Sequence, residues 1–299
     1  MIGEKRIVGE YSTSDDKGPL LFVTAGIHGN EPSGVVALEK VFGVLEREKP
    51  VISGKIVGVR GNVKALKNGV RFIDEDLNRT WTEQNVVQKV RDTNEKKEMF
   101  EIMDLLEKYP GSSFSKRYFL DCHTTSSESV PYISVQETGD NDAWAHRFST
   151  YIIRGFSDIV DGCIDHYLSR TGLTGFVFEG GQHKSGEAVR NHEGMIWKAL
   201  ENACGLDLDQ LKVYPNAAKV FSTGTDQPKT FEILYRHAIE DGDVFRMEKG
   251  YGNFRPIVTN ELLAIHNGEE VRSKWDAFVF MPLYQAQGND GFFVVREVC

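Results

Sequence analysis

Short apolar runs alternate with longer amphipathic segments through the first two thirds of the sequence, and this alternation limits the folds open to the chain. The apolar runs are "PLLFVT" at 19–24, "GKIVGVR" at 54–60, "RYFLDC" at 117–122, "PYISV" at 131–135 and "GFVFE" at 175–179. The amphipathic segments lie at 33–48, within 84–109 and at 186–203. Runs this short and this apolar are typical of buried parallel strands. The order of elements therefore predicts an α/β fold, with a mostly parallel or mixed central sheet flanked by helices.

The pattern changes after about Gly205, where no further long helical period is found. Short β-rich stretches such as "DAFVFMPL" and "GFFVVREV" are separated there by Gly, Asn and Asp turns, which is typical of a small all-β unit. We therefore expect an α/β domain over 1–205 and a β-rich domain over 206–299. No internal repeat or low-complexity linker separates them, so we expect the two parts to pack closely.

Composition narrows the classes of partner. The formal net charge of -9, with no basic stripe, argues against a nucleic-acid partner. No run approaches the roughly 20 apolar residues of a membrane span, and the four cysteines are widely spaced without a CxxC pair. We expect a cytoplasmic protein with reduced thiols that binds neither nucleic acid nor membrane. The sequence leaves a homodimer open.

The stretch "TAGIHGNEPSG" at 24–34 places an imidazole and a carboxylate three residues apart, directly after an apolar run. Buried ionisable groups cost several kcal/mol unless they are paired or bind a metal. Pro32 suits the first turn of the following helix, which puts Glu31 at the helix start and His28 in the loop before it. His123 follows "YFLDC", and Glu179 ends "GFVF". Because ligands bind beyond the carboxyl ends of parallel strands, these side chains are expected to converge.

His28, Glu31 and His123 together make a two-histidine, one-carboxylate set that suits Zn²⁺ and leaves a fourth position for water. Two neutral imidazoles and one carboxylate leave a net charge near +1, which would acidify that water and polarise a carbonyl group. Histidine and glutamate three residues apart also occur by chance in many helices. Taken alone, His28 therefore also fits an ordinary loop histidine.

A second polar stretch, "RFIDEDLNRTW" at 71–81, supplies the charges that a small anionic substrate would need. The guanidinium groups of Arg71 and Arg79 and the amide of Asn78 can clamp a carboxylate. Asp76 can accept a hydrogen bond from a ligand histidine and so fix its tautomer. Read alone, the stretch would be an unremarkable surface loop.

Four motifs, "GIHGNEPSG", "DEDLNR", "LDCHTT" and "VFEGGQ", occur in this order between residues 26 and 182. Together they resemble the succinylglutamate desuccinylase/aspartoacylase family, a branch of the zinc carboxypeptidase-like hydrolases. The resemblance implies zinc ligation by His28, Glu31 and His123, and general acid/base work by Glu179. It further assigns Arg71 to the scissile carbonyl, Asn78, Arg79 and Arg170 to the substrate carboxylate, and Asp76 to support of the first histidine. The β-rich C-terminal part would match the family's smaller domain, over the site entrance.

One departure from the family pattern affects the substrate. Aspartoacylases close their pocket with a tyrosine near the chain end, whereas "MPLYQAQGNDGFFVV" has Tyr284 several residues too early and offers polar residues such as Asp290 instead. A dicarboxylate pocket, and with it N-acetylaspartate as substrate, is therefore in doubt. His183 is close enough to Glu179 to line the site mouth. Strand alternation turns Cys122 away from His123.

These observations predict a hydrolase with one Zn²⁺ per chain that removes the acyl group from a small N-acyl amino acid or a related carboxylate-bearing amide. Two alternatives stay open. A zinc carboxypeptidase that cleaves a C-terminal residue from a peptide would use the same metal and base. A catalytically silent binding module of the same fold would have no need of the complete residue set.

Overall fold

The computed structural model describes residues 5–13, 17–156, 159–183, 185–212, 215–221 and 228–298. Its main feature is an 11-stranded sheet in the order β1-β3-β2-β4-β7-β5-β6-β8-β14-β13-β10. The first strands of the chain are β1 (Ile7–Ser12), β2 (Leu20–Ala25), β3 (Lys55–Arg60), β4 (Arg117–Thr125), β5 (Tyr132–Val135), β6 (Tyr151–Arg154) and β7 (Thr174–Gln182). The later ones are β8 (Thr230–Ala238), β10 (Arg255–Ile257), β13 (Ala277–Phe280) and β14 (Asp290–Val298). A separate sheet of three strands contains β9 (Phe245–Met247), β11 (Leu262–His266) and β12 (Glu269–Arg272).

The central sheet is mixed, as predicted. Strands β3, β2, β4 and β7 are parallel neighbours, and so are β5, β6 and β8. Strand β1 runs antiparallel to β3, and β5 runs antiparallel to β7. The five predicted strands correspond to β2, β3, β4, β5 and β7, but β4 and β7 each continue three residues further. His123 and Glu179 therefore lie within strands and not after them.

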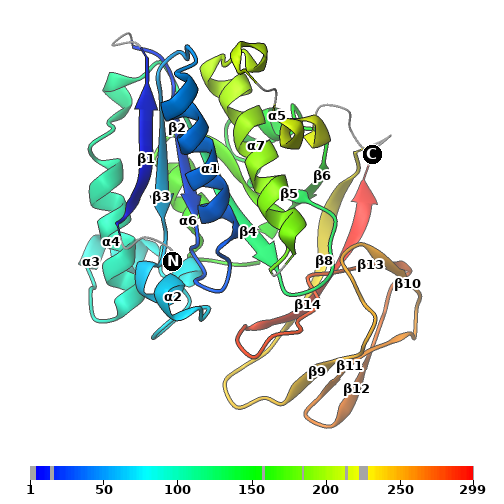
Figure 1. Cartoon of the computed structure of the whole chain (residues 1–299). Coiled ribbons are helices and arrows are strands. Elements are labelled where there is room, and N and C mark those ends of the chain that lie inside the picture. Colours follow the sequence, from blue (N-terminus) through cyan, green and yellow to red (C-terminus); the bar gives the residue numbers. More distant parts are fainter. Residues whose placement is uncertain are drawn as a thin grey trace.

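Helices cover both faces of the sheet (Figure 1). The helices are α1 (Ser33–Glu48), α2 (Val63–Asn68), α3 (Glu83–Gln88), α4 (Asn94–Leu106), α5 (Asn141–Ala145), α6 (Ile164–Arg170) and α7 (Gly186–Cys204). Alternation along β2 explains the two layers: Leu21 and Val23 pack with α1, α5 and α7, whereas Leu20 and Phe22 pack with α4 and α6. Every residue of β2 is buried, as expected for a strand between two helical layers.

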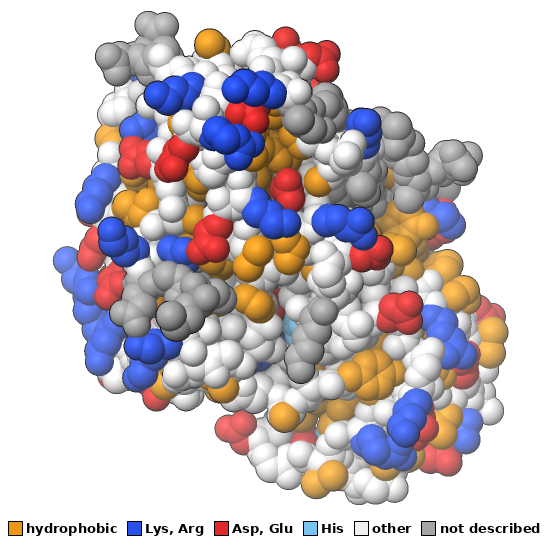
Figure 2. Space-filling view, in the orientation of Figure 1, with side chains coloured by type: hydrophobic (Ala, Val, Ile, Leu, Met, Phe, Trp, Pro, Cys, Tyr) orange, Lys and Arg blue, Asp and Glu red, His pale blue; other side chains and the backbone are white. Residues whose placement is uncertain are grey.

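The described residues after Gly205 contain no α-helix and form the seven strands β8 to β14. Strand β8 pairs with β6, so the central sheet runs without interruption from the α/β part into the β-rich part. Strands β9 to β14 form a lobe with its own apolar core, below the carboxyl ends of the parallel strands (Figure 1). Figure 2 shows a hollow between this lobe and the α/β body, in which a histidine side chain is visible.

The described residues bear on two expectations from composition, the absence of a membrane-spanning segment and the presence of reduced thiols. None of the helices among them has the length and apolar character needed to cross a membrane. Cys122, Cys163 and Cys204 are free and buried. Cys122 lies in the apolar core under α1, on the face of β4 opposite to the side chain of His123, as strand alternation predicted.

Helix α1, which follows Glu31, packs tightly on the sheet at one of its glycines and leaves open space at another. A Cβ atom at Gly34 would lie 2.7 Å from the Cβ of Cys122, whereas a Cβ at exposed Gly43 would meet nothing within 4 Å. We predict that Gly34→Ala lowers the free energy of unfolding by about 1–3 kcal/mol through overpacking. Gly43→Ala should raise it by about 0.5–1 kcal/mol, because alanine favours the helix. Denaturant unfolding of both variants tests this, and equal effects would contradict the packing described.

Candidate active site

His28, Glu31 and His123 meet at the carboxyl edge of the sheet, and all three are buried. His28 comes from the loop after β2, Glu31 precedes α1, and His123 lies in β4. Glu31 bridges the two imidazoles: its Oε1 lies 2.8 Å from His28 Nδ1, and its Oε2 lies 3.2 Å from His123 Nδ1. Burial works to raise the pKa of Glu31, but the two histidines hold it well below its ordinary value. The three predicted ligands are thus brought together.

Each imidazole is held from behind by its own aspartate. His28 Nε2 donates to Asp76 Oδ1 at 3.0 Å, as predicted for Asp76, and His123 Nε2 donates to Asp121 Oδ2 at 2.8 Å. Thr24 Oγ1 donates to the other oxygen of Asp121 at 2.6 Å, which fixes that carboxylate. Because each aspartate holds a proton on Nε2, loss of the other ring proton would leave the Nδ1 lone pair, on the side of Glu31, free to bind a metal.

This donor set fits zinc. The three residues offer two imidazole lone pairs and one carboxylate oxygen around one point, with their donor atoms within 4.8 Å of one another. Ligand atoms around a tetrahedral zinc ion lie roughly 3.3 Å apart, given bonds of about 2.0–2.1 Å. His28 Nδ1 lies 2.8 Å from Oε1 of Glu31 and His123 Nδ1 lies 3.2 Å from Oε2, so each imidazole has a carboxylate oxygen at about this spacing. Three protein ligands leave one position open, which is the arrangement of a catalytic zinc site.

Glu179 lies beside this cluster without a partner. In the register of the sheet it stands between His123 of β4 and Tyr132 of β5. Its Oε2 is buried and accepts no hydrogen bond from the described residues. Burial raises the pKa of Glu179 to about 8, assisted by the charges of Glu31 and Asp121 and opposed by His123 and Arg71. A carboxyl group with this pKa suits proton transfer near neutral pH.

Arg71 uses only part of its guanidinium group for structure. Its Nε and Nη2 donate to Asp76 Oδ2 at 3.2 and 2.8 Å. Its Nη1 lies 3.6 Å from Glu31 Oε1, at the edge of the candidate metal-ligand cluster, which consists of His28, Glu31 and His123. Asp76 therefore does not engage Nη1, and Arg71 lines the pocket beside Glu31.

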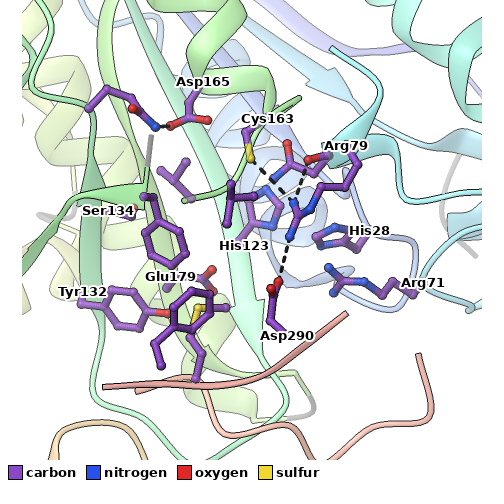
Figure 3. Close-up of a pocket in the computed structure, with 17 residues that line it drawn as sticks. His28, Arg71, Arg79, His123, Tyr132, Ser134, Cys163, Asp165, Glu179 and Asp290 are labelled. Atoms are coloured by element: carbon purple, nitrogen blue, oxygen red, sulfur yellow. Dashed lines mark hydrogen bonds and ion pairs between the residues drawn. The ribbon is translucent and has the colours of Figure 1, made fainter. Parts of the chain in front are cut away.

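Asn78 and Arg79 line the same pocket, but Arg79 already has a carboxylate partner. Arg79 Nη2 donates to Asp290 Oδ2 at 2.9 Å, and Arg236 Nε donates to Asp290 Oδ1 at 2.5 Å. Asn78 Oδ1 accepts a hydrogen bond from Ile164 N at 2.9 Å, which ties the turn at 77–79 to the start of α6. Asp290 comes from β14 and therefore brings the C-terminal lobe into the site (Figure 3).

The pocket has an empty volume of about 610 Å³, including its open mouth. The metal-ligand cluster lies along one side, and apolar side chains of Phe156, Val160, Met281 and Phe293 line another. His183 does not line this pocket but a neighbouring cavity that shares Arg71 and Asp290 with it, where His183 Nε2 donates to Gln285 Oε1 at 3.1 Å. Asn30 Nδ2 donates to the same oxygen at 3.0 Å, so the segment around 281–290 partly covers the site.

Two residues weighed from the sequence are not brought to this pocket. Arg170 is exposed in the last turn of α6, and it does not line the pocket. The structure therefore gives no support to the carboxylate-binding role expected for it. Tyr284 points elsewhere: its hydroxyl donates to Glu248 O at 2.6 Å.

Sequence reasoning missed several side chains that the fold places here. The role of Asp121 could have been found, because residues two apart in a strand share a face, and "DCH" puts it on the same face as His123. Tyr132 gave no comparable signal, since its place beside Glu179 depends on the antiparallel pairing of β5 with β7. The contact of Asp290 with Arg79 joins residues 211 positions apart.

The chain is similar to known proteins in both sequence and structure. The sequence profile of the Succinylglutamate desuccinylase/Aspartoacylase catalytic domain matches residues 17–185. Succinylglutamate desuccinylases from two Pseudomonas putida strains are similar to parts of the chain, at 35% identity over 78 residues and 28% over 123 residues. These segments cover 26% and 41% of this chain, and only 23% and 36% of the relatives' own lengths.

Solved structures show similarity over nearly the whole chain. Murine aminoacylase 3 aligns over 95% of this chain and 97% of its own, with a TM-score of 0.68 and 18% sequence identity. The succinylglutamate desuccinylase of Chromobacterium violaceum aligns over 95% of this chain and 86% of its own, with a TM-score of 0.68 and 13% identity. At such low identity the similarity establishes the fold.

The metal-ligand cluster predicts one tightly bound Zn²⁺ per chain. Glu31→Gln should lose most of this zinc, because an amide replaces the anionic oxygen that neutralises the ion. Glu46→Gln, an exposed change on the same helix, should keep it. Elemental analysis after dialysis, with zinc titration of both variants, measures the difference. Retention of zinc by Glu31→Gln at the parent's affinity would contradict the ligand assignment.

Proposed function

Because the chain belongs to the succinylglutamate desuccinylase/aspartoacylase family, we propose that it is a zinc-dependent amide hydrolase. Its substrate is a small N-acyl amino acid or a related carboxylate-bearing amide. The observation that carries the proposal is the convergence of the donor atoms of His28, Glu31 and His123 beside the unpartnered carboxyl group of Glu179. Such a constellation adds nothing to apolar packing, since burying these groups costs free energy that pairing or a bound ligand has to compensate.

Glu179 is the general base and acid of the proposed reaction. Zinc, when bound by the cluster, lowers the pKa of water and polarises the amide carbonyl. Glu179 takes a proton from the attacking water and then passes it to the nitrogen of the leaving amine. Its place between His123 and Tyr132 keeps the carboxyl group at the metal-ligand cluster. The apolar walls exclude bulk water from this transfer.

Arg71 supports the carbonyl side of the reaction. The Asp76 carboxylate holds two of its nitrogens, which fixes the plane of the guanidinium group. The remaining Nη1 donates to the carbonyl oxygen as negative charge develops on it. Asp76 thereby orients both His28 and Arg71 with its two oxygens.

Arg79 and Asn78 bind the substrate carboxylate. Asp290 now shares the Arg79 guanidinium group, but Arg236 holds the other oxygen of Asp290. A substrate carboxylate can therefore recruit Arg79 while Asp290 stays neutralised by Arg236. Anchoring this end of the substrate orients the amide bond at the metal-ligand cluster.

The covered mouth favours a small substrate over the alternatives. Met281, Asp290 and Phe293 of the C-terminal lobe line the pocket, and beside it Gln285 bonds to Asn30 and His183, which narrows access from this side. A carboxypeptidase has to admit an extended peptide through this side. A catalytically silent binding module would have no need of Glu179 beside a complete set of His28, Glu31 and His123.

Glu179→Gln tests the assigned base. The variant should keep its zinc, since Glu179 is not a ligand, yet lose turnover by about 10²–10⁴-fold because an amide cannot take the proton. KM should change less than kcat, as the lost interaction belongs mainly to the transition state. Amine release from a panel of N-acetyl, N-succinyl and N-formyl amino acids identifies the substrate for this measurement. Near-parental turnover of the variant would refute the role of Glu179.

Arg79→Ala tests the carboxylate clamp. Removing a charge-assisted contact should lower kcat/KM for carboxylate-bearing substrates on the order of a hundredfold, with a much smaller loss for their neutral amide analogues. Arg170→Ala, a change at the exposed end of α6, should leave the ratio between the two substrate types unaltered. Equal losses on both substrate types after Arg79→Ala would make Arg79 a structural residue.

A further inference from the structure

The arginines that line the pocket are paired with resident carboxylates. Arg71 is bound by Asp76, and Arg79 is bound by Asp290. Asp290 has a second cation in Arg236. These charges therefore compensate one another before any substrate arrives.

Asp165 also lines the pocket away from the metal-ligand cluster, but unlike Asp290 it is not paired with an arginine in the described part of the chain. It stands in the first turn of α6, lines the pocket and is only 3% exposed. Its Oδ2 accepts a hydrogen bond from Gln136 Nε2 at 2.6 Å, which fixes the carboxyl group (Figure 3). Among the described residues, no ion pair joins a lysine or arginine to Asp165. After burial, the charge of the neighbouring His166 acts most on the pKa of Asp165, and it lowers that pKa.

The surroundings of Asp165 form a distinct end of the pocket. Ser134 and Gln136 line it from the β5 side, and Val177 lines it from β7. Ser134 and Gln136 are two residues apart and so project to the same face as Tyr132. This end offers uncharged hydrogen-bonding groups around a single carboxyl group, at a distance from Glu179 in Figure 3.

A buried carboxyl group that is not paired with a lysine or arginine is costly, and a neighbouring histidine such as His166 offsets this cost only in part, since burial still dominates. Burial is the main cause that raises the pKa of Asp165. A cation in the pocket would compensate this cost, as an ion pair in a desolvated site. The buried carboxyl group thus marks a position that a charged partner can complete.

We propose that Asp165 determines substrate specificity by binding a cationic group on the side chain of the substrate. This inference rests on the proposed function and narrows its substrate class to N-acyl amino acids with a basic side chain. Arg79 would take the substrate carboxylate, and Asp165 would take the side-chain ammonium or guanidinium group. Cys163 lies between the two anchors, 3.7 Å from Arg79 Nη1 and within 4.8 Å of a carboxyl oxygen of Asp165.

A metal ion is a poorer occupant of this end. Cys163, Asp165 and His166 bring donor atoms within 4.8 Å of one another. Burial raises the pKa of the Cys163 thiol, however, and metal ions bind the thiolate. The guanidinium group of Arg79 beside this sulfur also repels a metal cation. An organic cation bound to Asp165 needs no bond to Cys163.

Matched substrate pairs test the proposal on the zinc-loaded enzyme. Nα-acyl ornithine and Nα-acyl norleucine have side chains of equal length and differ in the terminal ammonium group, and Nα-acyl arginine and citrulline form a second pair. We expect kcat/KM to favour the basic member by at least about tenfold. Asp165→Asn should reduce this ratio to about one, and Asp165→Glu should retain a preference for the basic member. Asp104→Asn, at an exposed carboxylate of α4, should keep the parent's ratio.

A ratio near one in the parent, or a ratio unchanged by Asp165→Asn, would overturn the proposal. Binding measurements separate its failure from failure of the proposed function. If no N-acyl amino acid of any charge is hydrolysed, the proposed function fails. Calorimetric titration of the zinc-loaded protein with free ornithine and norleucine then decides on the subsite: tighter binding of ornithine that Asp165→Asn abolishes supports it, and equal binding overturns it. Circular dichroism verifies that each variant is folded.

Discussion

The placement of Glu31 between two buried imidazoles is the constraint on which the rest of the site depends. A carboxylate with almost no contact with solvent is tolerated only where opposite charge or hydrogen-bond donors surround it. Glu31 meets this condition with His28, His123 and the backbone N–H of Thr124, which donates to Oε2 at 2.8 Å. The two imidazoles in turn need acceptors behind them, which are Asp76 and Asp121. The polar network thus extends outward from one carboxylate.

The sheet carries this network because its strands end at one edge. Parallel pairing of β2 with β4 and of β4 with β7 brings the loop after β2, His123 and Glu179 to adjacent positions. The alternation of side chains assigns the other face of β4 to the apolar core, where Cys122 packs under α1. One strand therefore serves both the hydrophobic layer and the polar site, and on its apolar face the contact of Gly34 with Cys122 shows how closely α1 approaches β4.

Much of this was predictable from short-range patterns. The strands β2, β3, β4, β5 and β7 are apolar runs bounded by turn residues. His28 and His123 follow such runs, and Glu179 ends one. Local sequence carries no comparable information about pairing between distant segments. The antiparallel place of β5, which puts Tyr132 beside Glu179, and the contact of Asp290 with Arg79 depend on tertiary packing. Arg170 shows that a local spacing can also mislead. Its spacing from Glu179 resembled a family pattern, but at the end of the short helix α6 its side chain is exposed to solvent.

The pairing of β8 with β6 fixes the C-terminal lobe to the α/β body and so limits the motions that can open the pocket. Backbone hydrogen bonds at Ile152, Ile153 and Arg154 connect the α/β body to the strand that leads into the C-terminal lobe. Rotating the whole lobe away from the body would break this ladder at the cost of several hydrogen bonds. The segment around 281–290 contacts the body mainly through side chains, at Asn30, Arg79 and His183. We therefore expect substrate entry and product release to depend on local rearrangement of this loop. Exchanging the loop alone would then change access to the pocket without disturbing the metal-ligand cluster.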